Sequence, residues 1–386
     1  MLSEKRKILI FSLWEVSISS IGGTEKYTKE LAECLVQEGF EVDVIMLSGQ
    51  NYIHNQVNYI SLQTDLISEI EISNFITPFS ISKLGDFEEF VLKLICQFVD
   101  IKSYRICFNN TQLFSFENFF EKKCISILHT NPQEFTQMFG KYSFDILSKI
   151  MNKKLNTIFV APSFYYSELY KTKYNIDCKC IEHSIDFEYM KELDRFDKKV
   201  ICQKYKINIS SRINLVVPSR LEIIQKRQDF LLESLSDCNF DYSKVNIIFT
   251  GIDTHYLANI EILKKLVPED SHQNLYFLNF TDIREALFLA DIIVLPSQTE
   301  SFGYSALESL FTNKPILLSD IPTFLEIGKN QYGIYFFETY NPKDLFNKLE
   351  KIIFELKDKN IDRNLNSLGN FYSQKTWINK YLKLIC

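Results

Sequence analysis

The chain has 386 residues, of which 46% are hydrophobic, and its formal net charge is -6 at pH 7. This length exceeds that of one typical domain and allows a large core, so we expect two domains. The negative balance argues against a nucleic-acid partner, because such a partner requires a basic face. The composition also excludes collagen-like and low-complexity chains.

Nine cysteines are scattered along the chain without Cys-x-x-Cys or Cys/His metal-ligand spacing. Dispersed thiols in odd number are typical of a reducing compartment, which predicts a cytoplasmic location. The apolar segment from Ile8 to Leu13 is too short for a signal-peptide core. No run of about 18 apolar residues occurs, so we expect no membrane-spanning helix.

Apolar runs alternate with helical patterns along the chain, which predicts an α/β fold with two doubly wound parallel sheets. Strands are predicted at Lys7–Leu13, Glu41–Leu47, Val57–Leu62, Tyr104–Asn109, Cys124–Thr130, Thr157–Pro162, Cys180–His183, Asn214–Pro218, Val245–Thr250, Leu275–Asn279, Asp291–Leu295, Pro315–Ser319 and Gly333–Phe337. Helices are predicted notably at Gly23–Glu38, Phe87–Val99, Phe144–Lys154, Phe164–Lys173 and Ile361–Ile385. The charged segment Glu188 to Val200 lacks a strand pattern. We therefore expect one domain over residues 1–190, a second over 191–365 and a terminal helix over 366–386.

Two glycines, Gly22 and Gly23, followed by Thr24, stand where the first strand region passes into a helix. Their backbone amides can face a phosphate, although two glycines can equally make only a tight turn. The full Gly-x-Gly-x-x-Gly fingerprint is missing, which argues against a nicotinamide-dependent dehydrogenase. His129 closes a later apolar strand, a position where histidine is most often structural.

Arg220 and Lys226 follow the predicted strand Asn214–Pro218. A guanidinium fork and an ammonium point charge can converge on a diphosphate and stabilise the charge that grows on a departing nucleotide. The ordinary alternative is a pair of basic residues in a solvated loop. Because the chain has no Asp-x-Asp motif, we predict no metal and no other cofactor.

The most informative stretch follows the predicted strand Asp291–Leu295 and ends at Glu308. Glu300 lies in its loop and Glu308 lies two turns into the next helix. Gly303, without a Cβ, lets a ligand approach helix amides that favour phosphate. Carboxylates accept hydrogen bonds from vicinal hydroxyls, so the stretch suits a diphosphate joined to a sugar. Two glutamates at this spacing also occur by chance on many helices.

Taken together, these segments resemble the donor-binding signature of retaining glycosyltransferases of family 4, the glycosyl transferases group 1, which have the GT-B fold of two Rossmann-like domains facing a cleft. The resemblance implies transfer of a sugar from a nucleoside-diphosphate sugar to a glycan or lipid-linked acceptor, in the biosynthesis of cell-surface polysaccharides or glycoconjugates. It implies catalytic roles for His129, Arg220, Lys226 and Glu300. It implies donor contacts for Gly22, Gly23, Thr24, Gly251, Ser301, Phe302, Gly303, Tyr304, Ser305 and Glu308.

The chain departs from the family at Ser219 and Asn279, where glycine is usual, and at His183-Ser184, where Asn-Gly is common. Asn279 falls in the loop that meets the base in the family, so the sequence does not predict which base is bound. Ser219 implies a slightly different local turn, and His183-Ser184 implies a divergent turn between the domains in which we expect His183 to be structural. Two alternatives stay open: a nucleotide-sugar epimerase, and a non-catalytic GT-B partner subunit. A basic amphipathic pattern over Tyr142 to Lys154 also keeps open a peripheral contact with the inner face of a membrane.

Overall fold

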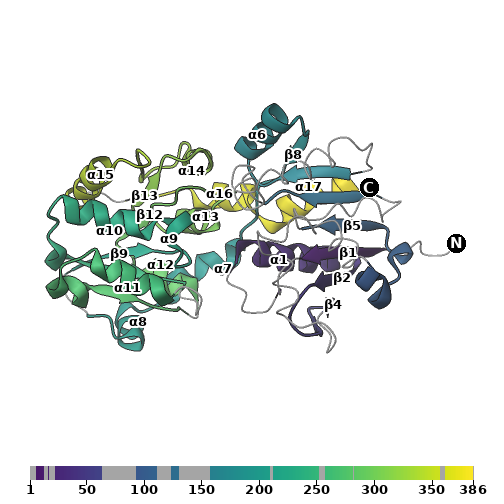
Figure 1. The fold of residues 1–386 in the computed structure, drawn as a ribbon, viewed down its shortest axis with the longest axis horizontal. Coiled ribbons are helices and arrows are strands. Elements are labelled where there is room, and N and C mark those ends of the chain that lie inside the picture. Colours follow the sequence, from purple (N-terminus) through teal and green to yellow (C-terminus); the bar gives the residue numbers. More distant parts are fainter. Residues whose placement is uncertain are drawn as a thin grey trace. The chain divides into compact units, whose positions relative to one another are not determined.

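The chain forms two compact units in a computed structural model, which describes residues 6–12, 16, 22–62, 93–110, 123–129, 157–208, 212–251, 257–280, 282–356 and 361–385 (Figure 1). The first unit comprises Met1–His183 with Gln374–Cys386, and the second comprises Ser184–Ser373. The sequence placed these divisions after residues 190 and 365.

The first unit contains an eight-stranded sheet with the order β3-β4-β2-β1-β5-β6-β7-β8. All neighbouring strands are parallel except β3 and β4, which are antiparallel. The strands are β1 (Lys7–Ser12), β2 (Glu41–Met46), β3 (Tyr52–His54), β4 (Val57–Ser61), β5 (Ile106–Asn109), β6 (Cys124–Ile127), β7 (Thr157–Ala161) and β8 (Cys178–Cys180). The helices are α1 (Gly23–Gln37), the 3-10 turn η2 (Ile101–Ser103), α6 (Phe164–Tyr174) and α17 (Gln374–Ile385).

Both faces of this sheet are buried. In β1, Ile8 and Ile10 belong to one core cluster, whereas Leu9 and Phe11 belong to another. Helices α1 and α17 supply the first cluster, and α17 packs against α1. Helix α6 supplies the second cluster. Burial on both faces explains why the strands read as continuous apolar runs rather than as alternating patterns.

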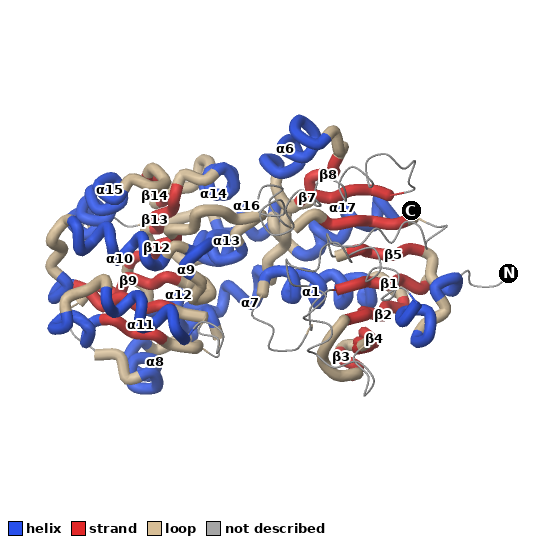
Figure 2. The backbone as a smooth tube through the Cα atoms, in the orientation of Figure 1, coloured by secondary structure: helices blue, strands red, loops and turns tan. Residues whose placement is uncertain are grey.

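The second unit contains a six-stranded parallel sheet with the order β11-β10-β9-β12-β13-β14, drawn in red in Figure 2. Its strands are β9 (Ile213–Val217), β10 (Val245–Phe249), β11 (Leu275–Phe277), β12 (Ile292–Leu295), β13 (Ile316–Ser319) and β14 (Ile334–Phe337). Its helices are α7 (Phe187–Lys191), α8 (Lys198–Tyr205), α9 (Ile223–Lys226), α10 (Gln228–Asp237), α11 (Leu257–Lys265), α12 (Ile283–Leu289), α13 (Tyr304–Leu310), α14 (Pro322–Gly328), α15 (Pro342–Glu355) and α16 (Leu365–Phe371), with 3-10 turns η4 (Glu192–Arg195), η5 (Tyr242–Lys244) and η7 (Glu269–Asn274).

Helices cover both faces of this sheet as well. Side chains of α10, α11 and α15 join one core cluster, and those of α8, α12, α13 and α14 join the other. In β12, Ile292 and Val294 face the first cluster, and Ile293 and Leu295 face the second. Every predicted strand has a counterpart, and the prediction of two doubly wound α/β sheets is confirmed.

The short strand β3 was not predicted. It forms a hairpin with β4 through Asn55 and Gln56, which both have positive φ angles, of 49° and 64°. Such angles suit a two-residue hairpin turn, but glutamine is an unusual residue in that conformation, so the turn was not predicted.

Two predicted elements are corrected. The strand expected at Cys180–His183 lies earlier, at β8, and Ile181 continues its ladder with one hydrogen bond to the Ala161 carbonyl at 3.0 Å. The single helix expected over Ile361–Ile385 is two helices, α16 and α17. At the break, the Tyr372 carbonyl accepts a hydrogen bond from the Ile185 amide at 2.8 Å, outside the helix.

The helix predicted at Phe144–Lys154, and with it the basic pattern of Tyr142 to Lys154, lies outside the described residues. Of the helix predicted at Phe87–Val99, residues 93–98 are described, and they are helical.

Candidate functional site

Three neighbouring strands of the second unit, β10, β9 and β12, end at the same edge of the sheet. Gly251 lies just after β10, Arg220 just after β9, and Glu300 in the loop after β12. The carboxyl edge of an open parallel sheet is where ligands bind in α/β proteins. The fold thus brings residues predicted from three separate segments to one edge.

Lys226 and Glu300, which were predicted to contact different parts of a donor, form an ion pair. The Lys226 Nζ atom lies 2.7 Å from Glu300 Oε1, and the Ser297 hydroxyl donates to the same oxygen at 2.9 Å. Their side chains are only 16% and 11% exposed. An ammonium has three donors, so the contact with Glu300 still allows Lys226 to donate to an anion.

The backbone around this pair is tied across two loops. The Gln225 side chain donates to the Thr299 carbonyl at 3.1 Å, and the Gln298 amide donates to the Gln225 carbonyl at 2.8 Å. The short helix α9 is capped by Glu222, whose carboxylate accepts hydrogen bonds from the amides of residues 224 and 225. These links fix Lys226 against the loop that carries Glu300.

Gly251 is required at its position by geometry. Its φ angle is +63°, and a Cβ there would lie 2.7 Å from the Arg220 Cα atom. The Leu221 amide donates to the Gly251 carbonyl at 3.0 Å. The glycine therefore permits a close approach of two loops and sets the position of Arg220.

Gln228 is a residue of this edge that the sequence did not reveal. Its side chain is fully buried, and its amide group donates to the Ser219 hydroxyl at 3.1 Å and to the Arg220 carbonyl at 2.8 Å. It therefore holds the turn that presents Arg220. A glutamine two residues after Lys226 has no pattern that separates it from a surface residue, so only the structure could identify it.

The segment Ser301 to Ser305 leads into α13. Gly303 has a φ angle of +98°, and a Cβ there would lie 2.8 Å from Phe324. Phe302 is 3% exposed and packs in the core, so its side chain is structural and only its backbone can face a ligand. Ser301, Tyr304 and Ser305 are half-buried. Glu308, on α13, is buried at 8% exposure.

In the first unit, Gly22 precedes α1 in an extended conformation, and the Gly22 carbonyl accepts from the Lys26 amide at 3.0 Å. Gly23 is exposed, and Gly22 and Thr24 are half-buried. The Thr24 carbonyl accepts a hydrogen bond from the Thr28 hydroxyl at 2.8 Å. The residues before Gly22 that complete the predicted glycine turn lie outside the described residues.

His129 lies at the end of β6 and takes part in a chain of hydrogen bonds. Its Nε2 atom bonds the Asn110 side-chain oxygen, and the Asn110 amide donates to the Thr28 hydroxyl. With the oxygen of Asn110 facing it, Nε2 must carry the proton, which leaves Nδ1 as an acceptor. Asn110, which follows β5, was not predicted, although a polar residue directly after a strand is a signal that could have found it.

Burial keeps the histidines of this group uncharged. Loss of solvation lowers the pKa of His129 to about 3. Burial, followed by the nearby His129 and Lys26, holds the pKa of His183 well below its usual value. The Tyr27 ring lies 4.8 Å from each imidazole, and His183 is 4% exposed. His129 can thus serve as a neutral hydrogen-bonding group near neutral pH.

Across the described ranges, no three His, Cys, Asp or Glu side chains are grouped so that they could hold a metal ion. None of the helices that the structure describes is both long and apolar enough to cross a membrane.

A family model for glycosyl transferases group 1 matches residues 203–366. This range lies within the second unit and includes Arg220, Lys226 and Glu300. The resemblance predicted from the sequence is confirmed at the level of this family.

Two curated relatives match shorter parts of the chain. "O-antigen biosynthesis glycosyltransferase WclY" of Escherichia coli is 36% identical over 78 residues, which are 20% of this chain and 21% of that protein. A Campylobacter jejuni enzyme, "N,N'-diacetylbacillosaminyl-diphospho-undecaprenol alpha-1,3-N-acetylgalactosaminyltransferase", is 34% identical over 105 residues, 27% of this chain and 28% of that protein. The chain therefore matches between about a fifth and about a quarter of the length of these relatives.

Likeness to a solved structure extends over nearly the whole chain. The structure of Anabaena HepE in complex with UDP-glucose superposes with a TM-score of 0.72 at 14% identity, covering 98% of this chain and 99% of that one. At this identity the likeness shows the fold. Residues 203–366 of the second unit therefore match the glycosyl transferases group 1 family, and the chain has the two-domain GT-B fold.

Proposed function

We propose that this chain is a retaining glycosyltransferase that moves a sugar from a nucleoside-diphosphate sugar to a glycan or lipid-linked acceptor. The observation that carries the proposal is the group of Lys226, Glu300 and Ser297 at the carboxyl edge of the second unit, within the range matched by the family. In this group an ammonium that can bind phosphate lies beside a carboxylate that can accept hydrogen bonds from hydroxyl groups.

The chemistry follows from charge. Breaking a bond between a sugar and a phosphate leaves negative charge on the nucleoside diphosphate, and positive groups fixed in advance lower that barrier. Lys226 and Arg220 would supply this charge without a metal. Glu300 would accept hydrogen bonds from the transferred sugar, and Glu308 from the ribose. Retention of configuration and independence of metal are parts of the proposal taken from the family.

The Lys226–Glu300 pair would orient the lysine ammonium for a donor. The Glu300 carboxylate holds the Lys226 ammonium in place and so orients it. When a donor arrives, the carboxylate and the diphosphate must share this ammonium. Because lysine carries three donor hydrogens, the pair can persist while Lys226 also binds phosphate. We expect donor binding to keep this contact rather than to break it.

The substrate classes rest on the relatives. HepE was solved with UDP-glucose, and the Campylobacter enzyme is named for a diphospho-undecaprenol acceptor and for N-acetylgalactosaminyl transfer. WclY is named for O-antigen biosynthesis. We accordingly propose a UDP-sugar donor and an acceptor used in the assembly of a cell-surface glycan, with the enzyme acting in the cytoplasm.

A panel of UDP- and GDP-sugars tests the proposal by thermal shift and by release of nucleotide with and without acceptor. We expect one donor to raise the melting temperature of the wild-type chain, and we expect Lys226→Met and Glu300→Gln to lose that rise. Lys204→Met is the matched control, because Lys204 forms a 2.8 Å ion pair with Glu285 between α8 and α12. A donor response that survives in both site variants would refute the proposal.

A further inference from the structure

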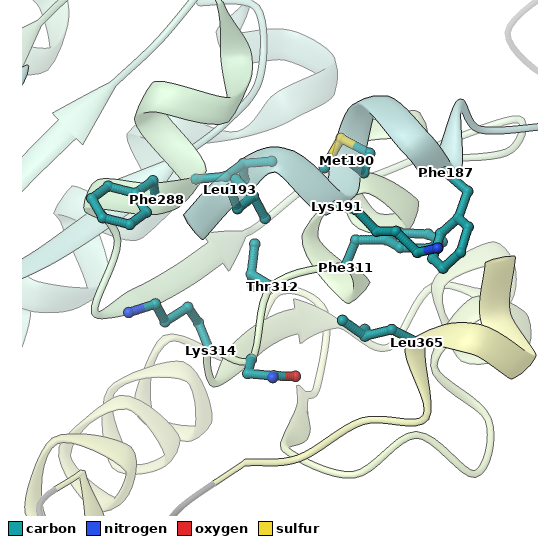
Figure 3. Close-up of a pocket in the computed structure, with 11 residues that line it drawn as sticks. Phe187, Met190, Lys191, Leu193, Phe288, Phe311, Thr312, Lys314 and Leu365 are labelled. Atoms are coloured by element: carbon teal, nitrogen blue, oxygen red, sulfur yellow. The ribbon is translucent and has the colours of Figure 1, made fainter. Parts of the chain in front are cut away.

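A cavity lies in the second unit, apart from the candidate functional site. It has a volume of about 400 Å³, within the range of small-molecule sites, and Figure 3 shows the residues that line it. Helix α7 and the turn η4 line it together with the end of α12, the loop before β13 and the start of α16. The lining residues are Phe187, Met190, Lys191, Leu193, Leu287, Phe288, Phe311, Thr312, Asn313, Lys314 and Leu365.

This cavity is separate from the site described above. Lys314 precedes β13, whereas the candidate site lies beyond the opposite, carboxyl ends of the strands. The four residues of β13 span about 13 Å, so the core of the sheet lies between the two places. None of the residues that line the cavity belongs to the group of Arg220, Lys226 and Glu300.

The lining combines apolar walls with positive charge. Seven of the eleven residues are apolar, two are lysines, and none is a carboxylate. The Lys191 ammonium lies 4.0 Å from the centre of the Phe187 ring and 3.1 Å from Glu188 at the surface. Lys191 is thus already compensated, and the charge that matters is that of Lys314.

The Lys314 ammonium has no hydrogen bond or ion pair with any residue that the structure describes. Lys314 is half-buried, and burial lowers the pKa of its ammonium. Asp291 is the carboxylate whose charge reaches it, but Asp291 is engaged by Lys198 at 3.4 Å and by the Asn214 amide at 2.9 Å. A partly desolvated cation without a partner is stabilised by an anionic ligand.

The loop that carries Lys314 is fixed in place. Arg363 is 4% exposed, and its guanidinium donates to the carbonyls of Thr312 and Lys314, the latter at 2.7 Å. It also donates to the Tyr332 carbonyl at 2.9 Å. A buried arginine bonded to carbonyls holds this rim of the cavity rigid, so a ligand would meet a preformed site.

We propose that the cavity binds a single-chain amphiphile with an anionic head group, its tail against the half-buried Phe187, Phe288 and Leu365 and its head group at Lys314. The apolar walls account for a hydrocarbon tail, and the ammonium for a phosphate or carboxylate head. The cavity does not overlap the candidate donor site, because the two lie at opposite edges of the sheet.

Calorimetric titration of the full chain with monomeric decyl phosphate, below its micelle concentration, tests the proposal. We expect saturable binding with one site, and binding weaker by about tenfold or more for decanol or a decyl trimethylammonium salt, because a bond to a charged group is lost. Lys314→Met should weaken decyl phosphate by a similar factor. Lys348→Met is the control, since Lys348 is a half-buried lysine on α15 away from the cavity.

Two further arms identify the source of the ligand and the independence of the site. Vesicles of phosphatidylglycerol should not bind to the cavity in place of monomeric decyl phosphate. UDP should not compete with decyl phosphate for binding. The proposal fails if decyl phosphate does not bind, if decanol binds equally well, if Lys314→Met binds like the wild type, or if only vesicles bind.

Discussion

The carboxyl edges of the two sheets carry different chemistry. In the second unit the edge is ionic, with Arg220 nearby and the Lys226–Glu300 pair in contact at 2.7 Å. Among the described residues at the corresponding edge of the first unit, His129 and Asn110 form an uncharged hydrogen-bonded chain, called here the neutral edge, and burial keeps the pKa of His129 low. Sheets of the same architecture thus present two different edges. The ionic edge is suited to a diphosphate, and the neutral edge is suited to hydroxyl groups.

This difference comes from the loops and not from the sheets. Both sheets have apolar strands buried on both faces, and β1 and β12 divide their side chains between two clusters in the same way. Chemistry is placed by the few residues that follow each strand. Changes to these residues should therefore alter binding and catalysis more than they alter stability.

The largest expected effect is the loss of the ionic edge. Lys226→Met should lower kcat by about 100-fold, the usual order for removing one group that stabilises charge in the transition state. Steady-state release of nucleotide measures it. Lys204→Met, the control, should keep the wild-type kcat. If Lys226→Met also keeps it, the ionic edge has no catalytic role.

The neutral edge should respond to acid. Since the native pKa of His129 is about 3 and its ordinary value is 6.5, protonation favours the unfolded chain. The stability present above pH 6.5 is therefore lost as the pH falls toward 3. We expect a decrease of about 2 kcal/mol in the free energy of unfolding between pH 7 and pH 4.5 from this one group.

Urea unfolding followed at both pH values measures this decrease. His129→Gln should reduce the dependence on pH, while His272→Gln, in the second unit, should leave it unchanged. A His129 imidazole that titrates near pH 6.5 by NMR would contradict the neutral edge.

A smaller effect is expected from the residue that positions Arg220. Gln228→Met removes both hydrogen bonds of the buried side chain and keeps its volume, so kcat should fall by about tenfold with little change in KM. A purely structural role would lower the melting temperature and leave the kinetic constants of the folded enzyme intact. Gln228→Glu should not rescue kcat, because a carboxylate oxygen would face the Arg220 carbonyl.

The smallest effect concerns the proton on His129. Thr28→Val removes the hydroxyl that accepts from Asn110, and we expect a loss of stability of about 1 kcal/mol. Without that bond Asn110 can rotate, so the Nε2-protonated form of His129 should become less dominant. Nitrogen chemical shifts of the imidazole report the tautomer, and an unchanged shift would show that Asn110 does not set it.

Much of the fold could be predicted, because buried parallel strands are continuous apolar runs that need no knowledge of the tertiary structure. Elements that depend on distant partners were not predictable. The hairpin of β3 turns through Gln56 at a positive φ angle, and the break between α16 and α17 coincides with a hydrogen bond to the distant Ile185. Neither has a local signal.

The candidate site shows the same limit. Lys226 and Glu300 follow from motif and spacing, but their direct contact depends on the bonds that tie α9 to the loop after β12. Gln228 acts through the backbone of another residue, and such roles leave no pattern in one sequence. Phe302 was predicted to contact the donor, and because its side chain packs in the core, such a contact would come from its backbone.

The central claim is that the ionic edge of the second unit binds the diphosphate of a sugar nucleotide. Calorimetric titration of UDP, and of GDP in parallel, into the wild-type chain, Lys226→Met and Lys204→Met tests it most directly. We predict that one nucleotide binds the wild type and Lys204→Met alike and binds Lys226→Met at least about tenfold more weakly. Equal affinity for the wild type and Lys226→Met, or no binding of either nucleotide to the wild type, would contradict the claim.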